Sequence, residues 1–204
     1  MSINFNLKLE EDAFTLEPPQ WRALTIRALW PDDFAIEQRF LLSLSADALY
    51  QRTLGASIKA SAATVQALLN YRHGPEMALA AIRDDGLQNA DGGCAAQILG
   101  VARYAVGGDP MSAEMAIVIA DDTRGMGLGS RLLTQLHLQA QAHGYRRIEA
   151  QTFSQNKAML ALARRCGYRV KVQAGDGAIR LLELELGLDL VHGDGATSSS
   201  LLAN

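Results

Sequence analysis

The segment DDTRGMGLGS, residues 121–130, places three glycines at alternate positions between an apolar run and a helix-like stretch. The apolar run is AEMAIVIA (residues 113–120), and the stretch that follows is LLTQLHLQAQAHG (residues 132–144). Glycine lets a backbone pass close to a group that a side chain would block. The start of a helix offers unpaired N–H groups that carry a partial positive charge. The segment therefore predicts an anion site, with a phosphate or pyrophosphate as its ligand.

The rest of the chain alternates between strand-like and helix-like patterns. Apolar alternation bounded by turn residues predicts strands at residues 24–30, 77–83, 98–106, 113–120, 146–153, 168–172 and 178–186. The 3.6-residue spacing of apolar positions predicts helices over residues 31–44, 62–71, 132–143 and 156–165. The second to fourth strands are expected to be antiparallel neighbours, and the last two to form a hairpin. This order predicts one domain of the α/β (α+β) class.

Composition limits the kinds of partner. The chain has 204 residues, nearly half of them apolar, which is enough for one sizeable core. Its formal net charge of -3 provides no general attraction to nucleic acid, so we expect no nucleic-acid partner. No apolar run of about 18 residues and no leader-like opening occur, so we expect a cytoplasmic protein without a membrane partner.

The cysteines and histidines do not have the spacing of a metal site. Cys94 and Cys166 lie far apart in the sequence and are expected to be reduced, structural thiols. The four histidines are scattered, and His137 and His143 fall where a helix would turn polar residues to water. We therefore predict no metal site.

The glycine spacing leaves a dinucleotide-binding alternative open. That motif has the pattern G-x-G-x-x-G after a strand, with an acid about 20 residues further on. Here the third glycine, Gly129, falls one residue early, although Glu149 stands at about the expected place. Only one strand follows before a short helix and a hairpin, which leaves too little chain for the usual parallel sheet.

The six residues from Arg124 to Gly129 fit the R/Q-x-x-G-x-G/A pattern of the GNAT acetyltransferase superfamily, and the order of elements resembles that fold. The resemblance runs from about residue 24 to residue 186. It is most specific over residues 113–168, where AEMAIVIADDTRGMGLGSRLL and NKAMLALARRCGY are similar to the catalytic domains of bacterial protein lysine acetyltransferases. It implies a GNAT-like domain over residues 21–188, with a mixed central sheet of about six to seven strands flanked by helices. Residues 1–20 would form an N-terminal arm, and residues 189–204 a disordered tail.

The resemblance also implies where acetyl-CoA binds. The pyrophosphate would lie on main-chain amides of the glycine segment, and the pantetheine and thioester on the preceding strand. Asn156 matches an asparagine that approaches the cofactor in the family, and it is equally an ordinary helix N-cap. The residues assigned to acetyl-CoA are Ile117, Val118, Ile119, Arg124, Gly125, Met126, Gly127, Leu128, Gly129, Ser130 and Asn156.

The reaction needs a base, because an amine must be neutral to attack a thioester. A lysine with a pKa of about 10.4 is almost fully protonated at neutral pH. Glu114 opens an apolar strand, on the same side as Ala116 and Val118 if alternation holds. Partial burial would raise its pKa, and similar protein acetyltransferases carry their base at this position. The alternative is that Glu114 is a solvent-facing strand residue without a chemical role.

No general acid can be assigned by the same comparison. Many members of the superfamily place a tyrosine four residues before the Gly-Phe or Gly-Tyr pair that ends the last core helix, and here that position is Ala163. Tyr168 follows Gly167, but we expect it to be a core aromatic.

The sequence therefore predicts an N-acetyltransferase that moves an acetyl group from acetyl-CoA directly to a primary amine, with a protein lysine as the acceptor. Two alternatives stay open, a non-enzymatic acyl-CoA-binding regulatory module and an acetyltransferase for small-molecule amines. A homodimer is expected from the family alone.

Overall fold

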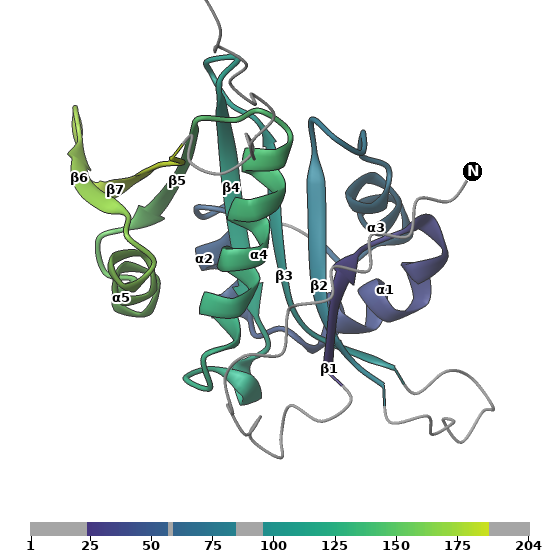
Figure 1. Ribbon diagram of the computed structural model, residues 1–204. Helices are drawn as coiled ribbons and strands as arrows, with labels where there is room; N and C mark the ends of the chain where they lie inside the picture. Colours follow the sequence, from purple (N-terminus) through teal and green to yellow (C-terminus); the bar gives the residue numbers. More distant parts are fainter. Residues whose placement is uncertain (1–23, 57–58, 85–95, 188–204) are drawn as a thin grey trace, which may run out of the picture.

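The computed structural model describes residues 24–56, 59–84 and 96–187, and its core is a twisted seven-stranded sheet (Figure 1). The strand order is β1-β2-β3-β4-β5-β7-β6, and every neighbouring pair is antiparallel except β4 and β5. The strands are β1 (Leu24–Ala28), β2 (Met77–Arg83), β3 (Gln97–Val106), β4 (Ser112–Ile119), β5 (Arg147–Phe153), β6 (Arg169–Gln173) and β7 (Asp176–Glu185).

Helices cover both faces of the sheet. One face carries α4 (Leu128–Ala142), which crosses β2, β3 and β4, and α5 (Lys157–Arg165) packs against α4 and β6. The other face carries α1 (Phe34–Ser43), α2 (Ala46–Arg52) and α3 (Ala62–Leu69) (Figure 1). None of the helices in the described ranges has the length and hydrophobicity needed to cross a membrane.

The apolar run of β4 is buried on both sides because the sheet has two helical layers. Met115, Ile117 and Ile119 belong to the core cluster under α4, whereas Val118 packs against the cluster under α1 and α3. A strand covered on both faces reads as a continuous apolar run rather than as an alternating one. The same alternation puts Glu114 on one side of the strand with Ala116 and Val118, as the sequence predicted, and α2 packs on that side.

The fold class, the mixed sheet and the predicted order of strands and helices are confirmed. One helix was missed. Leu44 is extended, with ψ 139°, and Ser45 then caps a new helix because its Oγ accepts a hydrogen bond from the Ala48 N–H at 3.1 Å. The expected arm (residues 1–20), the tail (residues 189–204) and Cys94 lie outside the described residues.

The parallel pair β4 and β5 positions the site. A parallel connection requires a crossover, and α4 provides it. The two strands pair only from Ser112 with Arg147 to Glu114 with Glu149 and then separate. A dinucleotide-binding sheet would be largely parallel, so this topology argues against that alternative.

Candidate functional site

A cavity of about 550 Å³ lies where β4 and β5 separate. Its walls are residues 115–119 of β4, residues 150–152 of β5, most of the glycine segment, the first turns of α5 and one side of α2. The Tyr50 ring of α2 stacks on Phe153 at the end of β5, with ring centroids 5.1 Å apart. The missed helix α2 therefore closes one side of the cavity.

The β4 wall offers main-chain hydrogen-bonding groups. From Met115 to Ile119 the strand pairs with β3 on one edge, but its β5 edge has no ladder partner among the described strands. Main-chain groups on that edge therefore face the cavity. The Ala120 N–H donates a hydrogen bond to Leu99 of β3. By alternation, the groups of Ile117 and Ile119 lie on the free edge, whereas those of Val118 lie on the β3 edge. Such a strand edge can bind the amide and carbonyl groups of an extended ligand.

The glycine segment forms the end wall of the cavity and leads into α4. Gly125 and Gly127 have φ of +79° and +88°, in the left-handed region that favours glycine, and Gly127 is the N-cap of α4. No hydrogen bond to the N–H groups of Leu128 and Gly129 is found within the described ranges, so these first-turn donors are available to a ligand. The arrangement is suited to an anion.

Two of the predicted residues in this segment, Met126 and Ser130, do not line the cavity. Met126 is exposed and does not line the cavity. Ser130 also lies outside the lining, and its N–H donates to the Gly127 carbonyl at 3.1 Å. The third glycine, Gly129, allows α4 and α5 to pack closely, because a Cβ at this position would lie only 3.0 Å from Leu162 Cδ2 of α5.

Arg124 connects the glycine segment to α2. Its guanidinium lies 2.9 Å from Asp121 Oδ1, and Asp121 accepts hydrogen bonds from the Ser45 N–H and hydroxyl at 3.0 and 3.1 Å. Hydrogen bonding by Ser45 and the charge of Arg124 hold the pKa of Asp121 below its usual value. Since Ser45 is the N-cap of α2, the two walls of the cavity are held together by one carboxylate.

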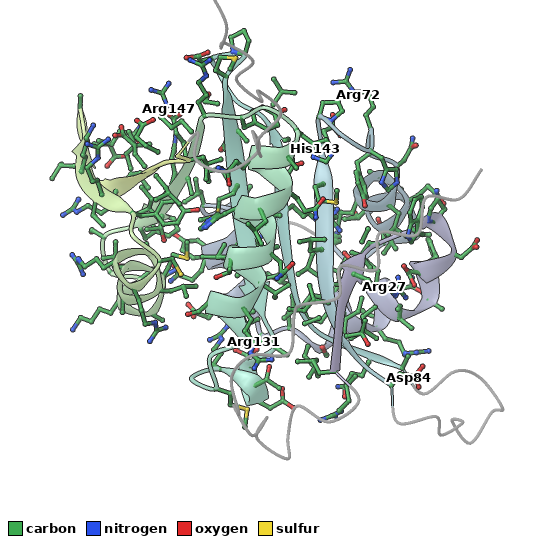
Figure 2. The ribbon with its side chains drawn as sticks, in the orientation of Figure 1. Arg27, Arg72, Asp84, Arg131, His143 and Arg147 are labelled. Carbon is green, nitrogen blue, oxygen red and sulfur yellow. The ribbon has the colours of Figure 1, made fainter. Side chains whose placement is uncertain are left out.

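The charged side chains of the cavity lining are mainly basic. Its cationic side chains are Arg52, Arg124, Lys157 and Arg165, against one acidic side chain, Asp47. Arg131 lies at the same end of α4 as the glycine segment, and Arg147 lies toward the opposite end of the molecule (Figure 2). A concave basic surface attracts a polyanion. Of the four cationic side chains that line the cavity, only that of Arg124 was predicted from the sequence.

Asn156 lines the cavity and is also the N-cap of α5. Its Oδ1 accepts a hydrogen bond from the Met159 N–H at 3.0 Å, so the capping role is confirmed. The amide NH₂ group remains for a ligand, because capping uses only the side-chain oxygen.

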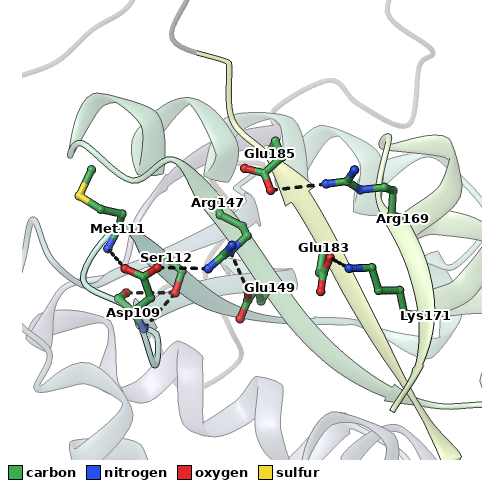
Figure 3. A network of polar contacts seen from close by, with 9 residues as sticks. All are labelled: Asp109, Met111, Ser112, Arg147, Glu149, Arg169, Lys171, Glu183 and Glu185. Atoms are coloured by element: carbon green, nitrogen blue, oxygen red, sulfur yellow. Dashed lines mark hydrogen bonds and ion pairs between the residues drawn. The ribbon is translucent and has the colours of Figure 1, made fainter. Parts of the chain in front are cut away.

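Glu114 lies beside the cavity at the point where β4 and β5 part. The expected partial burial of Glu114 is wrong, because its side chain is exposed. The neighbouring carboxylate on the same face, Glu149 of β5, pairs with Arg147 Nε at 2.7 Å, and Arg147 also reaches Asp109 (Figure 3). Among the residues that the structure describes, Glu114 has no ion-pair partner, but it interacts electrostatically with Arg52.

A charged group on the α2 side of the sheet was not predicted from the sequence. Glu37 is 1% exposed, and its Oε1 accepts a hydrogen bond from Arg103 of β3 at 2.8 Å. Burial raises the pKa of Glu37, and the charge of Arg103 opposes that rise. Burial and the repulsion from Arg103 lower the pKa of Arg52 to about 10. Glu37 falls within the apolar stripe of its helix, and a charge in such a stripe is the signal that could have identified it.

His137 is the other departure from expectation. Instead of facing water it is partly buried, and its Nε2 lies 2.7 Å from the Tyr168 hydroxyl. Tyr168 is 4% exposed, which confirms it as a core aromatic. The described residues contain no group of histidine, cysteine or acidic side chains able to hold a metal ion.

Comparisons with known proteins agree on one family. A family model described as the acetyltransferase (GNAT) family matches residues 59–168. An acetyltransferase of Pseudomonas aeruginosa (strain PAO1) is 30% identical over 148 residues, which are 72% of this chain and 75% of that protein. The range matched by the family model includes the glycine segment.

Solved structures share the fold. The GNAT domain of PAT from S. lividans has a TM-score of 0.67 at 22% identity, and the match covers 83% of this chain and 99% of that one. A putative acetyltransferase from Salmonella typhimurium, solved with its cofactor acetyl-CoA, has a TM-score of 0.59 at 19% identity, with 86% and 99% covered.

Proposed function

Because this chain belongs to the acetyltransferase (GNAT) family and uses acetyl-CoA as its acyl donor, we propose that it transfers the acetyl group directly to a primary amine, with a protein lysine as the acceptor. The observation that supports this most strongly is the separation of β4 from β5 beyond Glu114 and Glu149. It opens a cavity that extends from the start of α4 to a free strand edge beside a carboxylate.

We place the coenzyme in this cavity with its diphosphate at the start of α4 and its thioester toward Glu114. Its diphosphate belongs at the N–H groups of Leu128 and Gly129, where the left-handed Gly125 and Gly127 leave the backbone open. Its pantetheine arm then runs along the β5 edge of β4, with the thioester carbonyl at the N–H groups of Ile117 and Ile119. The basic lining complements the phosphates, and about 550 Å³ is a usual size for a ligand pocket.

The reaction requires an amine that has lost its proton. At pH 7 the deprotonation of an ordinary lysine costs about 4.6 kcal/mol. Glu114 takes that proton, directly or through water, and the neutral nitrogen attacks the thioester carbon. N–H groups of β4 stabilise the negative oxygen that develops. The C–S bond then breaks and the sulfur leaves as a thiolate. The nitrogen gives up its second proton, which reaches the thiolate directly or through water and converts it to the thiol.

The face that carries Glu114 favours a cationic acceptor. The strand register places Glu114, Glu149 and Glu183 side by side across β4, β5 and β7. Adjacent strands lie about 5 Å apart, so the three carboxylates form a short row. Glu149 and Glu183 are paired with Arg147 and Lys171 (Figure 3), which leaves Glu114 as the row's carboxylate without a close partner in the described ranges.

The deciding experiment follows acetyl transfer by mass spectrometry. The full chain is incubated with acetyl-CoA and, in separate reactions, a lysine-containing protein mixture, spermidine and free amino acids. We expect acetylated protein lysines and release of free CoA. Acetylation of small amines alone would replace the protein acceptor, and tight acetyl-CoA binding without any acetylated product would favour the regulatory module. A cytoplasmic location and a homodimer stay predictions.

A further inference from the structure

A second, smaller cavity of about 100 Å³ lies between the sheet and the helices α1, α2 and α3. We call it the inner chamber. Most of its wall is aliphatic or aromatic and comes from Leu41, Leu44, Leu49 and Leu68, together with Phe40, Val101 and Val118. Its polar end consists of Glu37, Arg52, Thr53 and Arg103.

The inner chamber and the coenzyme cavity share two lining residues, Arg52 and Val118. These two side chains therefore form the partition between the cavities. Val118 belongs to the strand segment that we assign to the thioester, and its side chain points to the inner chamber. The partition thus stands next to the place where the acyl group of the donor ends.

Arg52 is suited to act as a movable part of this partition. Its interactions within the described ranges are electrostatic, with Arg103, Glu37 and Glu114, and no hydrogen bond or ion pair holds its guanidinium. A change of rotamer therefore breaks no hydrogen bond, and its cost lies in the electrostatic contacts with Glu37 and Glu114. Rotation of this side chain would join the two cavities.

The polar end of the inner chamber is incompletely satisfied. Glu37 Oε1 pairs with Arg103, but the buried Oε2 has no hydrogen-bond partner. A buried carboxylate oxygen requires a donor, and a water molecule is the simplest one. We therefore expect water to remain near Glu37, while the apolar part of the chamber is available to carbon atoms.

We propose that the inner chamber receives the end of an acyl chain longer than acetyl, so that propionyl-CoA and butyryl-CoA also serve as donors. This inference rests on the proposed function. A methylene group needs roughly the 30 Å³ of a water molecule, so the chamber holds about three such groups. Butyryl adds two carbons to acetyl and leaves room for the water at Glu37, whereas octanoyl adds six and does not fit.

The transfer itself is unchanged by the longer chain. The amine nitrogen forms a bond to the acyl carbonyl carbon, and the C–S bond breaks. Of the two protons that the ammonium loses, one goes through Glu114 to solvent and the other converts the leaving CoA thiolate to the thiol. Only the alkyl end of the acyl group enters the inner chamber.

Isothermal titration calorimetry tests the inference without a known acceptor. Dissociation constants are measured for CoA, acetyl-CoA, propionyl-CoA, butyryl-CoA and octanoyl-CoA with the full chain. Each buried methylene is worth up to about fourfold in affinity, so butyryl-CoA should bind several-fold more tightly than acetyl-CoA. Octanoyl-CoA should lose this gain.

The variants Leu49→Phe and Leu68→Phe each place a larger side chain in the wall of the inner chamber. Neither residue belongs to the proposed coenzyme site. Each should abolish the gain for butyryl-CoA and leave acetyl-CoA affinity unchanged. Leu42→Phe is the matched control, since Leu42 is 69% exposed on α1 and does not line the chamber.

The outcomes separate this inference from the proposed function. If acetyl-CoA binds and the longer esters bind more weakly in the unmodified chain, the inference is wrong and the function stands. If butyryl-CoA keeps its advantage in a folded Leu49→Phe or Leu68→Phe variant, the acyl chain lies elsewhere and the inference is wrong. If no CoA compound binds, the proposed function fails as well.

Discussion

Glu114 and Glu149 are the last residue pair at which β4 and β5 are in register, and the two strands separate immediately beyond them. The same pair therefore marks where the coenzyme cavity begins and places a carboxylate at its edge. Of the two, Glu149 is neutralised by Arg147 at 2.7 Å, whereas Glu114 is exposed and lacks a close partner in the described part of the chain. This difference makes Glu114 the stronger candidate for the base.

The variant Glu114→Gln should lower kcat by about a hundredfold or more, because an amide cannot accept the ammonium proton. Acetyl-CoA affinity should stay unchanged, since Glu114 does not line the coenzyme cavity. Steady-state rates and calorimetric titration measure the two effects. The control is Glu149→Gln, on the same face one strand away, which should keep most of the activity. Equal losses in both variants would show that the row supplies only negative charge.

The variant Gly127→Ala should weaken acetyl-CoA binding by about tenfold. A φ of +88° costs an L-residue roughly 1–2 kcal/mol, and relief of that strain would turn the first N–H groups of α4 away from the diphosphate. Calorimetric titration with acetyl-CoA measures the change. Gly108→Ala is the control, because Gly108 has open space around its Cα and no positive φ. An unchanged dissociation constant for Gly127→Ala would remove the glycine segment from the site.

The sequence predicted the fold well because the periodicity of the apolar residues agreed with the positions of the turn and capping residues. The run from residue 113 to residue 120 is covered by helices on both faces, with Glu114 as its one exposed residue, and Gly127 caps the helix that follows it. By contrast, α2 was missed because it has only seven residues, and its signal is confined to the capping residue Ser45. Short helices depend on tertiary contacts more than on propensity, and here those contacts are with β4.

The predicted residues that line the cavity belong to local segments, whereas the lining residues that were not predicted come from distant parts of the chain. Residues 117–119 and the glycine segment are continuous in sequence, so one motif identified them. Arg52 comes from the unpredicted α2, and its neighbours Glu37 and Arg103 lie 15 and 51 positions away in the sequence. No periodic pattern encodes such a contact. Likewise, the role of Gly129 depends on Leu162 of another helix.

The variant Glu37→Ala should destabilise the fold by about 3–5 kcal/mol. The side chains of Glu37 and Arg103 are 2% and 14% exposed, so removing the carboxylate leaves a buried guanidinium unpaired. Urea unfolding followed by circular dichroism measures the loss. In the control Glu185→Ala the broken pair with Arg169 is exposed on both sides and should cost less than about 1 kcal/mol. A similarly small loss for Glu37→Ala would mean that water replaces the carboxylate in the inner chamber.

Acid should destabilise the fold through His137. Burial lowers the pKa of this histidine to about 4, whereas an unfolded histidine titrates near about 6.5. Between these values the unfolded chain binds a proton that the folded chain does not, so stability falls as the pH falls. The contribution of His137 amounts to about 2 kcal/mol between pH 7 and pH 5.

The variant His137→Gln should remove that part of the pH dependence. Its free energy of unfolding is expected to be lower at pH 7, because the contact with the Tyr168 hydroxyl is lost, but to change less on going to pH 5. Burial, not the Tyr168 hydroxyl, lowers the pKa of His137, so the variant Tyr168→Phe should lower stability at pH 7 and keep the slope. Urea unfolding at a series of pH values gives both quantities. If wild type and His137→Gln lose the same stability between pH 7 and pH 5, the acid sensitivity arises from another group, and His137 titrates alike in the folded and unfolded chain.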